Sequence, residues 1–202
     1  GVRELRKIGR DSWHEIDQLG LLRPITKWGA RIISADSAAR VTKTALTMAL
    51  SGRPGPVHIE LPKDIAKVES SVGAGAALKF SAIQEASRVG PNPKLVEKAC
   101  DLLLAADRPV ILAGGGVLRS AAEKSLLAFA ELLPIPVATT SNGRGTIPED
   151  HPLAIGPIGQ YGTPFASEEI KQADVVLALG TRFSDVATRD WTLISPSAKI
   201  IH

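Results

Sequence analysis

Three glycine-containing loops carry the residues of this sequence that are best suited to binding an anion. One is the triplet at 114–116, and the others span residues 140–145 and 180–185, which add Arg144 and Arg182 respectively. Glycine lets a backbone approach a phosphate or ribose closely, and arginine can make a two-pronged contact with phosphate or carboxylate. The residue types therefore indicate a nucleotide-type ligand.

Each of these features has a plainer alternative. A tight strand-to-helix turn also explains a glycine triplet, and Arg182 could be a surface arginine paired with Asp185. The triplet is not the dinucleotide fingerprint, which needs a third glycine at a fixed offset, and no acidic residue closes the strand expected at 136–139. An ordinary NAD-dependent dehydrogenase is thereby disfavoured.

The other reactive residue types form no recognisable centre. The four histidines, His14, His58, His151 and His202, are scattered without metal-ligand spacing, so we predict no metal site. No serine, histidine and acid arrangement suggests a hydrolase triad.

Apolar strands separated by helices are expected to position the three loops. The strands are expected at 109–113, 136–139, 174–179 and 199–201, and the intervening helices at 120–133 and 164–172. Near-continuous apolar strands imply a parallel sheet that is covered on both faces. In such a sheet, ligands bind beyond the carboxyl ends of the strands, where the three loops would lie. The second part of the chain is therefore predicted to be a doubly wound, Rossmann-like α/β domain.

The helix expected to open this domain has a clear start, with Asn92 as its cap and Pro93 at its first position. Its apolar residues recur on one face and predict a buried stripe made of Leu95, Ala99, Leu102, Leu103 and Ala106. Cys100 lies within the same pattern and has no second cysteine to pair with. We predict a buried, reduced, structural thiol, which favours a reducing compartment such as the cytoplasm.

The first part of the chain reads as a partial α/β unit. A helix at 34–50 is followed by a rigid turn at 51–56 and a short strand at 57–61, while residues 66–92 have the Ala, Gly and Ser content of a linker. We expect domains at 1–66 and 93–202 joined by a linker at 67–92. Because the last residues read as a strand that simply stops, we expect a piece of a longer protein.

The composition excludes several classes of protein. The 202 residues include 44% apolar residues and one Cys, which is typical of a soluble globular protein without a disulfide framework. A net charge of +3 sets up no strong field, so no nucleic-acid partner is implied. No apolar run approaches the roughly 18 residues of a membrane span, and no membrane association is predicted.

Ordered strings are more specific than single residues. In the first part they span 9–15, 23–28 and 51–57, the last containing Gly-Arg-Pro-Gly-Pro and leading through a strand to Leu-Pro-Lys-Asp at 61–64. In the second part they include the triplet, 159–163 and 180–183. The whole chain resembles thiamine-diphosphate enzymes of the acetohydroxyacid synthase (acetolactate synthase) group. The resemblance implies the end of their pyrimidine-binding domain followed by their central domain.

The resemblance implies a 2-oxo acid decarboxylase and carboligase, a transferase that uses thiamine diphosphate and magnesium. The cofactor forms a carbanion that attacks a 2-oxo acid, carbon dioxide leaves, and the enamine adds to a second carbonyl. The family's activating glutamate lies upstream, and its Gly-Asp-Gly string belongs to a later domain and does not occur here. This piece alone is therefore expected to be inert, and the full-length protein is expected to be a homodimer or homotetramer.

The resemblance also assigns individual residues. In this group the central domain holds FAD, which performs no redox step, and related enzymes place ADP or CoA there. The implied contacts are Arg53, which would reach across from the first domain, and Gly114, Gly115, Gly116, Thr140, Asn142, Gly143, Gly159, Gln160, Tyr161, Gly180 and Arg182. Lys63 would stand at the mouth of the substrate channel, with Trp13 and His14 beside the reaction centre.

Besides Trp13 and His14, which stand where the group usually has Phe and Gln, the sequence departs from the synthase pattern at four positions of the central domain. Ser184 and Val186 replace an acidic residue and an arginine, and Gln160 and Tyr161 replace Met and His. Other enzymes of the superfamily therefore stay open, among them oxalyl-CoA decarboxylase, sulfoacetaldehyde acetyltransferase, glyoxylate carboligase and pyruvate oxidase. A central domain that only binds FAD, ADP or CoA, or that is purely structural, is a further alternative.

Overall fold

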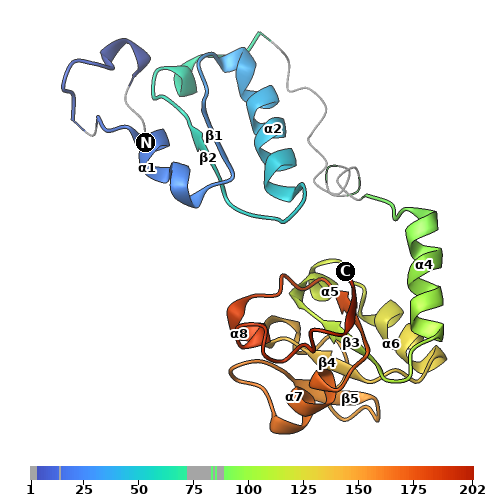
Figure 1. The fold of residues 1–202 in the computed structure, drawn as a ribbon. Coiled ribbons are helices and arrows are strands. Elements are labelled where there is room, and N and C mark those ends of the chain that lie inside the picture. Colours follow the sequence, from blue (N-terminus) through green and yellow to red (C-terminus); the bar gives the residue numbers. More distant parts are fainter. Residues whose placement is uncertain (1–3, 14, 72–82, 84, 86–88) are drawn as a thin grey trace. The chain divides into compact units, whose positions relative to one another are not determined.

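A computed structural model describes residues 4–13, 15–71, 83, 85 and 89–202 of the chain. The chain separates into two compact units, Gly1–Gly90 (unit 1) and Pro91–His202 (unit 2), each of which is described by itself (Figure 1). His14 and most of the linker predicted at 67–92 lie outside the described residues.

Unit 1 is built around two parallel strands with helices alongside. Its elements are the short 3-10 turns η1 (Leu5–Lys7), η2 (Arg23–Ile25), η3 (Ala35–Ser37) and η4 (Ile65–Lys67), the helices α1 (Gln18–Leu22) and α2 (Ala38–Leu50), and the strands β1 (Trp28–Arg31) and β2 (Val57–Glu60). The sequence predicted β2 and the long helix, but β1 was missed. That strand has only four residues, one of them Gly29, so its apolar signal is weak.

Helix α2 covers this small sheet because its inward positions are apolar. Val41 and Ala45, four residues apart, are both buried, as the 3.6-residue period requires. Its entry is fixed by Ser34 and Ser37, each of which accepts a hydrogen bond from the other's backbone N–H. The helix predicted at 34–50 is thus present, with its first turn wound as a 3-10 helix.

A buried ion pair joins the two strands of unit 1. Arg31 and Glu60 are register partners, and the Arg31 Nε donates a hydrogen bond to Glu60 Oε2. The Glu60 side chain has no exposed surface, whereas 27% of the Arg31 side chain is accessible. Burying a carboxylate is costly unless it is paired, so the arginine is what makes Glu60 tolerable there.

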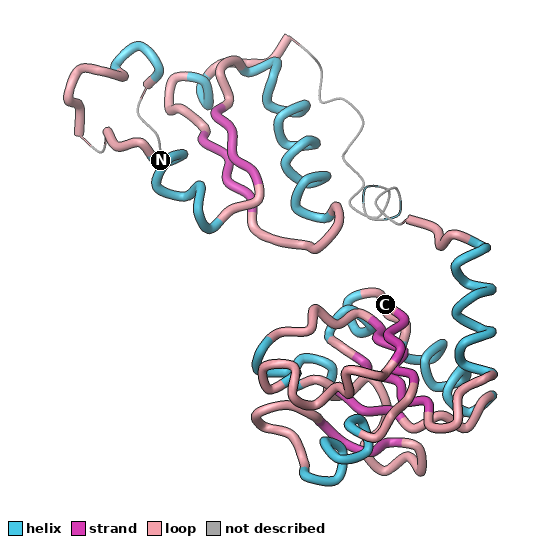
Figure 2. The backbone as a smooth tube through the Cα atoms, in the orientation of Figure 1, coloured by secondary structure: helices cyan, strands magenta, loops and turns pink. Residues whose placement is uncertain are grey.

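Unit 2 contains a five-stranded sheet with all strands parallel, as the apolar strand pattern predicted (Figure 2). Its strands are β3 (Pro109–Ala113), β4 (Val137–Thr139), β5 (Ala154–Pro157), β6 (Val175–Leu179) and β7 (Lys199–Ile201). Its helices are α4 (Pro93–Leu104), α5 (Gly115–Arg119), α6 (Glu123–Leu132), the 3-10 turn η5 (Ser141–Gly143), α7 (Pro164–Lys171) and α8 (Asp185–Thr188).

The strand order is β5-β4-β3-β6-β7, so the chain adds strands on one side of β3 and then on its other side. The chain first runs outward from β3 through β4 to β5, and then returns to build β6 and β7 on the other side. This is the doubly wound order, and its topological switch point lies between the ends of β3 and β6. The predicted fold class is confirmed.

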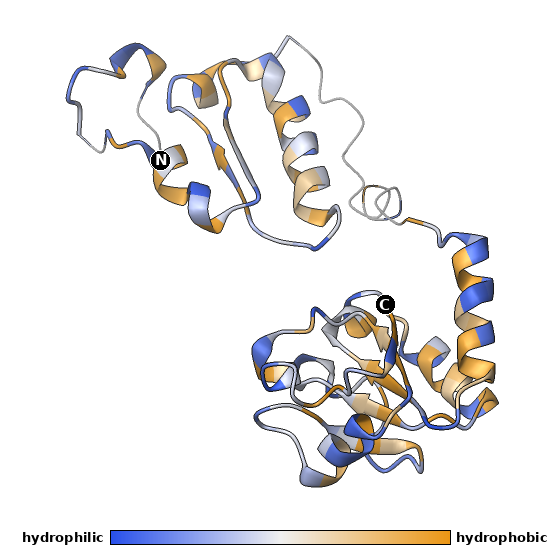
Figure 3. Ribbon diagram, viewed as in Figure 1, coloured by the Kyte–Doolittle hydropathy of each residue, from blue (hydrophilic) through white to orange (hydrophobic). Residues whose placement is uncertain are grey.

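Alternate residues of the central strand, β3, pack into two separate hydrophobic cores, one on each face of the sheet. Ile111 and Ala113 pack on one face with Leu126 and Ala130 of α6, while the intervening Leu112 packs on the other face in the core that contains residues of α7. Burial on both faces explains why these strands are almost wholly apolar, as Figure 3 shows.

Helix α4 begins as predicted, with the Asn92 side chain accepting a hydrogen bond from the Lys94 N–H. The predicted buried stripe is wrong at its start, because Leu95 is 64% exposed, and Leu103 is its only buried residue. Cys100 is exposed rather than buried. The helix packs mainly through its C-terminal end, so its amphipathic pattern (Figure 3) extends beyond the contact that it makes.

Two further boundaries differ from the prediction, and two elements were missed. The triplet is not simply a turn, because α5 begins at Gly115. The helix expected at 120–133 starts only at Glu123, after a turn in which Ala121 has a positive φ of 51°. Strand β5 and helix α8 were not predicted at all. None of the helices in the described part of the chain has the length and apolar character needed to cross a bilayer.

Asp174 ties the start of β6 to the turn before β3. Its carboxylate accepts hydrogen bonds from the N–H groups of Asp107 (2.8 Å) and Arg108 (3.0 Å). These bonds, first the one from Asp107, lower the pKa of Asp174 below its ordinary value of 3.8 because they favour the charged form.

Replacing Arg31 by methionine should destabilise the chain by about 2–3 kcal/mol, because the Glu60 carboxylate stays buried without its partner. The double variant Arg31→Met/Glu60→Leu should recover most of that loss. Urea unfolding followed by circular dichroism measures both. Arg144→Met is the matched control, since its ion pair with Glu149 is exposed on both sides and its loss should cost under about 0.5 kcal/mol. Equal costs for Arg31→Met and Arg144→Met would contradict this account of Glu60.

Asp174→Asn should remove a pH-dependent part of the stability. Because the folded pKa is depressed, the contribution of Asp174 is present above its ordinary pKa of 3.8 and is lost as the pH falls through the folded value. The difference in unfolding free energy between the wild type and Asp174→Asn should be constant from neutral pH to about pH 5 and shrink below pH 4. A difference that does not vary with pH would refute the prediction.

Candidate functional site

The loops after β3 and β6 meet at the switch point in direct backbone contact. A Cβ atom added to Gly114 would lie 2.5 Å from the Gly180 carbonyl oxygen, and one added to Gly116 would lie 2.5 Å from the Gly180 Cα. The Gly116 N–H donates to the Gly180 carbonyl at 2.9 Å. Neighbouring backbone therefore fills the space that these glycines leave, so their first role is to let the two loops close together.

The loop after β4 is joined to the same place. A Cβ atom on Gly143 would lie 2.1 Å from the Ala113 carbonyl oxygen, and one on Gly115 would lie 2.7 Å from the Asn142 carbonyl oxygen. The Thr140 N–H also donates to the Ala113 carbonyl at 2.9 Å. Only glycine fits at residues 115 and 143 without displacing main chain.

The loop after β5 contacts α8. The Gln160 N–H donates to the Val186 carbonyl at 2.8 Å. Gly159 has a positive φ of 99°, and a Cβ atom on it would lie 2.4 Å from the same carbonyl oxygen. The structure thus brings the predicted residues of unit 2 together at the carboxyl edge of one sheet.

These residues differ in accessibility. Gly114, Gly115, Thr140, Gly143 and Gly159 are buried and shape the loops. The residues that remain exposed to a ligand are Asn142, Gln160, Tyr161, Gly180 and Arg182.

Arg182 is a cation that remains available at this edge. Its side chain is exposed, and within the described residues it forms no ion pair, with Asp185 or any other acid. The loop after β4 offers a contrast, because Arg144 is already paired with Glu149 at 2.8 Å. An unpaired arginine beside Gly180 can receive a phosphate or carboxylate without first breaking another contact.

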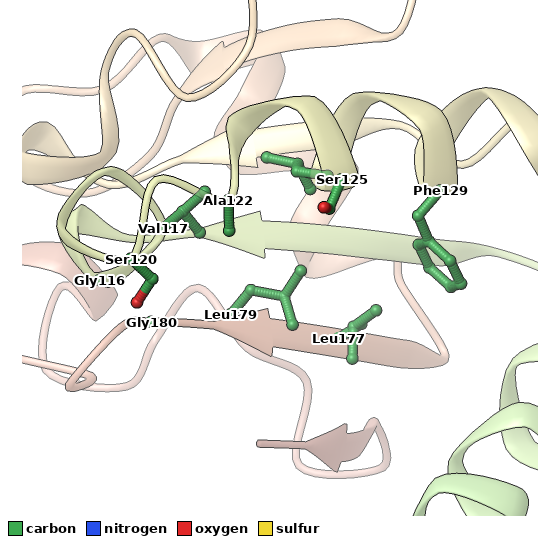
Figure 4. Close-up of a pocket in the computed structure, with 10 residues that line it drawn as sticks. Gly116, Val117, Ser120, Ala122, Ser125, Phe129, Leu177, Leu179 and Gly180 are labelled. Carbon is green, nitrogen blue, oxygen red and sulfur yellow. The ribbon is translucent and has the colours of Figure 1, made fainter. Parts of the chain in front are cut away.

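A cavity of about 380 Å³ lies next to the same loops, between helices α5 and α6 and strand β6 (Figure 4). Its walls are mostly apolar, with Leu177 and Leu179 on the strand and Phe129 on the helix, and Gly116 and Gly180 line one end of it. Sequence reasoning missed this cavity. Leu177 and Leu179 point to one face by strand alternation, but the sequence does not reveal that α5 and α6 leave a hollow over that face.

The predicted residues of unit 1 lie on exposed segments. Lys63 is exposed, and the neighbouring Asp64 carboxylate holds the Leu5 N–H at 3.1 Å. Trp13 is 80% exposed, and His14 lies outside the described residues. The part of the chain that the structure describes contains no group of three or more His, Cys, Asp or Glu side chains able to hold a metal ion.

Arg53 lies on a turn that Lys27 braces. The Lys27 ammonium donates to the carbonyl oxygens of Ser51 (2.6 Å) and Arg53 (2.8 Å), and its stem would lie 2.9 Å from a Cβ atom on Gly55. The Arg53 side chain is exposed, and the described residues offer it no ion pair. Its contact with a ligand of unit 2 stays a prediction.

Comparisons with known proteins agree with this architecture. The model of the thiamine pyrophosphate enzyme central domain matches residues 96–202. A probable acetolactate synthase large subunit of Methanocaldococcus jannaschii is 44% identical over 201 residues, which cover 96% of this chain and 33% of that protein. An acetolactate synthase of Mycobacterium bovis is 36% identical over 96% of this chain and 31% of that protein.

A plant relative, a probable chloroplastic acetolactate synthase 2 of Oryza sativa subsp. japonica, is 36% identical over the full chain and 30% of its own length. The chain thus spans about a third of the length of the curated relatives that it matches. Since the family model covers more than half of the chain and coincides with the doubly wound unit, the chain belongs to the thiamine pyrophosphate enzymes and carries their central domain.

Proposed function

We propose that the protein from which this chain derives is a thiamine-diphosphate-dependent 2-oxo acid decarboxylase and carboligase of the acetolactate synthase kind. The observation that carries the proposal is the similarity to acetolactate synthases along 96% of the chain, in unit 1 as well as in the central domain. The substrate would be pyruvate or a related 2-oxo acid. The assembly would be a homodimer or homotetramer in the cytoplasm.

Thiamine diphosphate, when bound, supplies the carbanion and the electron sink for decarboxylation. This chain contains no Gly-Asp-Gly string, so we assign none of its residues to the diphosphate or to magnesium. Its contribution to the reaction would be to the substrate. Lys63, exposed at the end of the segment after β2, would attract the anionic 2-oxo acid, with Trp13 and His14 near the reaction centre.

In unit 2 we propose a binding site for an adenine nucleotide, either FAD or ADP. The support is the exposed, unpaired Arg182 beside Gly180, at the switch point where doubly wound sheets bind ligands. Arg182 would take a phosphate, and Asn142, Gln160 and Tyr161 would offer further contacts. The buried residues of the loops, Gly114, Gly115, Thr140, Gly143 and Gly159, together with Gly116, would hold this edge in shape, and Arg53 would add a second cation.

Arg182→Ala in the full-length protein should weaken FAD or ADP binding about tenfold or more, because a hydrogen bond to a charged group is worth about 1.5–3 kcal/mol. Equilibrium titration of each nucleotide measures the dissociation constant. Lys171→Ala removes an exposed cation from α7 in the same unit and should change nothing. If Arg182→Ala changes neither nucleotide content nor activity, the central domain is a structural spacer.

The full-length protein, supplied with thiamine diphosphate, magnesium and pyruvate, should release carbon dioxide and form acetolactate. Lys63→Ala should raise KM for pyruvate about fivefold with a smaller effect on kcat, because attraction to the channel mouth acts before the chemical step. Lys67→Ala, also exposed and four residues further on, serves as the charge-matched control. Absence of both products from the unmodified enzyme would refute the proposed activity.

A further inference from the structure

Two aromatic rings are stacked at the carboxyl edge of the unit 2 sheet. The ring centroids of Phe183 and Trp191 are 5.2 Å apart with an angle of 19° between their planes. His202 meets Phe183 edge-on, at 5.3 Å and 77°. Aromatic pairs in these geometries attract each other, so the three rings form one ordered group.

This aromatic group adjoins the anion contact proposed above. Phe183 directly follows Arg182 in the loop after β6, and His202 directly follows β7. A nitrogen of the His202 ring lies 3.0 Å from the carbonyl oxygen of Thr181, which ties the ends of the two strands together. Arg182 and Phe183 lie in the loop after β6, Trp191 follows α8 and His202 follows β7, so the rings and the unpaired guanidinium share the carboxyl edge of the sheet.

One face of the indole remains open. Trp191 is 52% exposed, although one face of its ring is stacked on Phe183. Phe183 itself is half-buried and packs against the core under α7, so it serves as the support and Trp191 as the outer layer. Exposing this much of a tryptophan forgoes hydrophobic stabilisation that burial would provide.

The backbone that presents the two rings is strained. Phe183 has a φ of 51°, and Arg189, Asp190 and Trp191 are three consecutive residues with φ of 47°, 54° and 64°. Bulky side chains rarely adopt this region, and such residues persist where surrounding contacts enforce them, often at ligand sites.

The contacts that enforce this backbone lie in the neighbouring turn. The Trp191 N–H donates to the Thr188 Oγ1 at 3.1 Å, and the Leu193 N–H donates to the Thr188 carbonyl oxygen at 3.2 Å. Thr188 is completely buried. The rings are thus held in place before any ligand arrives.

We propose that the open face of Trp191 is the stacking surface for the flat base of the nucleotide whose phosphate Arg182 binds. A flat aromatic surface and an unpaired guanidinium at the same edge of the sheet would select a ligand that carries both an aromatic ring and an anionic group. Trp191 is thus a specificity-determining residue for the base, while Arg182 recognises the phosphate. This inference rests on the proposed nucleotide site and deepens it.

The experiment titrates two probes into the full-length protein: ADP, which has base and phosphates, and inorganic pyrophosphate, which has no ring. Trp191→Leu should weaken ADP binding about tenfold, within the range seen for base–aromatic stacking, and leave pyrophosphate binding unchanged. Trp191→Phe should retain most of the ADP affinity. Arg182→Ala should weaken both probes. Phe165→Leu, which removes another exposed aromatic ring of unit 2, is the control and should change neither.

Tryptophan fluorescence gives an independent readout. ADP should quench the emission of the wild-type protein, pyrophosphate should not, and the quenching should disappear in Trp191→Leu. If Trp191→Leu binds ADP as tightly as the wild type, or loses ADP and pyrophosphate equally, the stacking role is wrong while the nucleotide site stands. If the wild type binds neither probe, the nucleotide site itself is wrong.

Discussion

Main chain touches main chain where the loops after β3 and β6 meet, and the candidate site of unit 2 depends on that contact. Gly114 and Gly116 lie against Gly180 so closely that no side chain fits between them. The two loops are thereby fixed with respect to each other, and Thr181, the residue after Gly180, also lies against Gly114. The glycines form the edge of the candidate site, and the side chains exposed there to a ligand are Arg182 and its neighbours.

Much of this architecture follows from local rules that the sequence displays. Strand β3 is apolar at every position and is covered on both faces, so its parallel, sandwiched setting could be predicted. The start of α4 could be predicted because Asn92 and Pro93 satisfy the first turn chemically. The edge that holds the candidate residues of unit 2 followed from the strands, since loops after parallel strands share one edge.

The predictions that were wrong or missing depend mostly on which other elements pack against a residue, and the local sequence does not contain that information. The pattern around Leu95 and Cys100 is helical and apolar, but periodicity does not say how far along α4 the sheet extends, and both residues are exposed. The ligand contact predicted for the glycine triplet stays a prediction, but the sequence does not reveal that these glycines also let neighbouring backbone approach closely. Strand β5 was missed because its short run contains Gly156 and Pro157, which are rare in strands, and its register shifts against β4.

The ion pair between Arg31 and Glu60 has a consequence for how β1 and β2 find each other. If the strands slipped by one residue, Glu60 would stand opposite Ala30 or Ile32, and its carboxylate would be left in an apolar layer without a cation. Short strands with few side chains discriminate poorly between alignments on hydrophobic grounds alone. The Arg31–Glu60 ion pair therefore selects the correct register of β1 and β2. A misaligned pair of strands would bury Glu60 without its cation, whereas the ion pair adds little net stability to the correctly aligned strands.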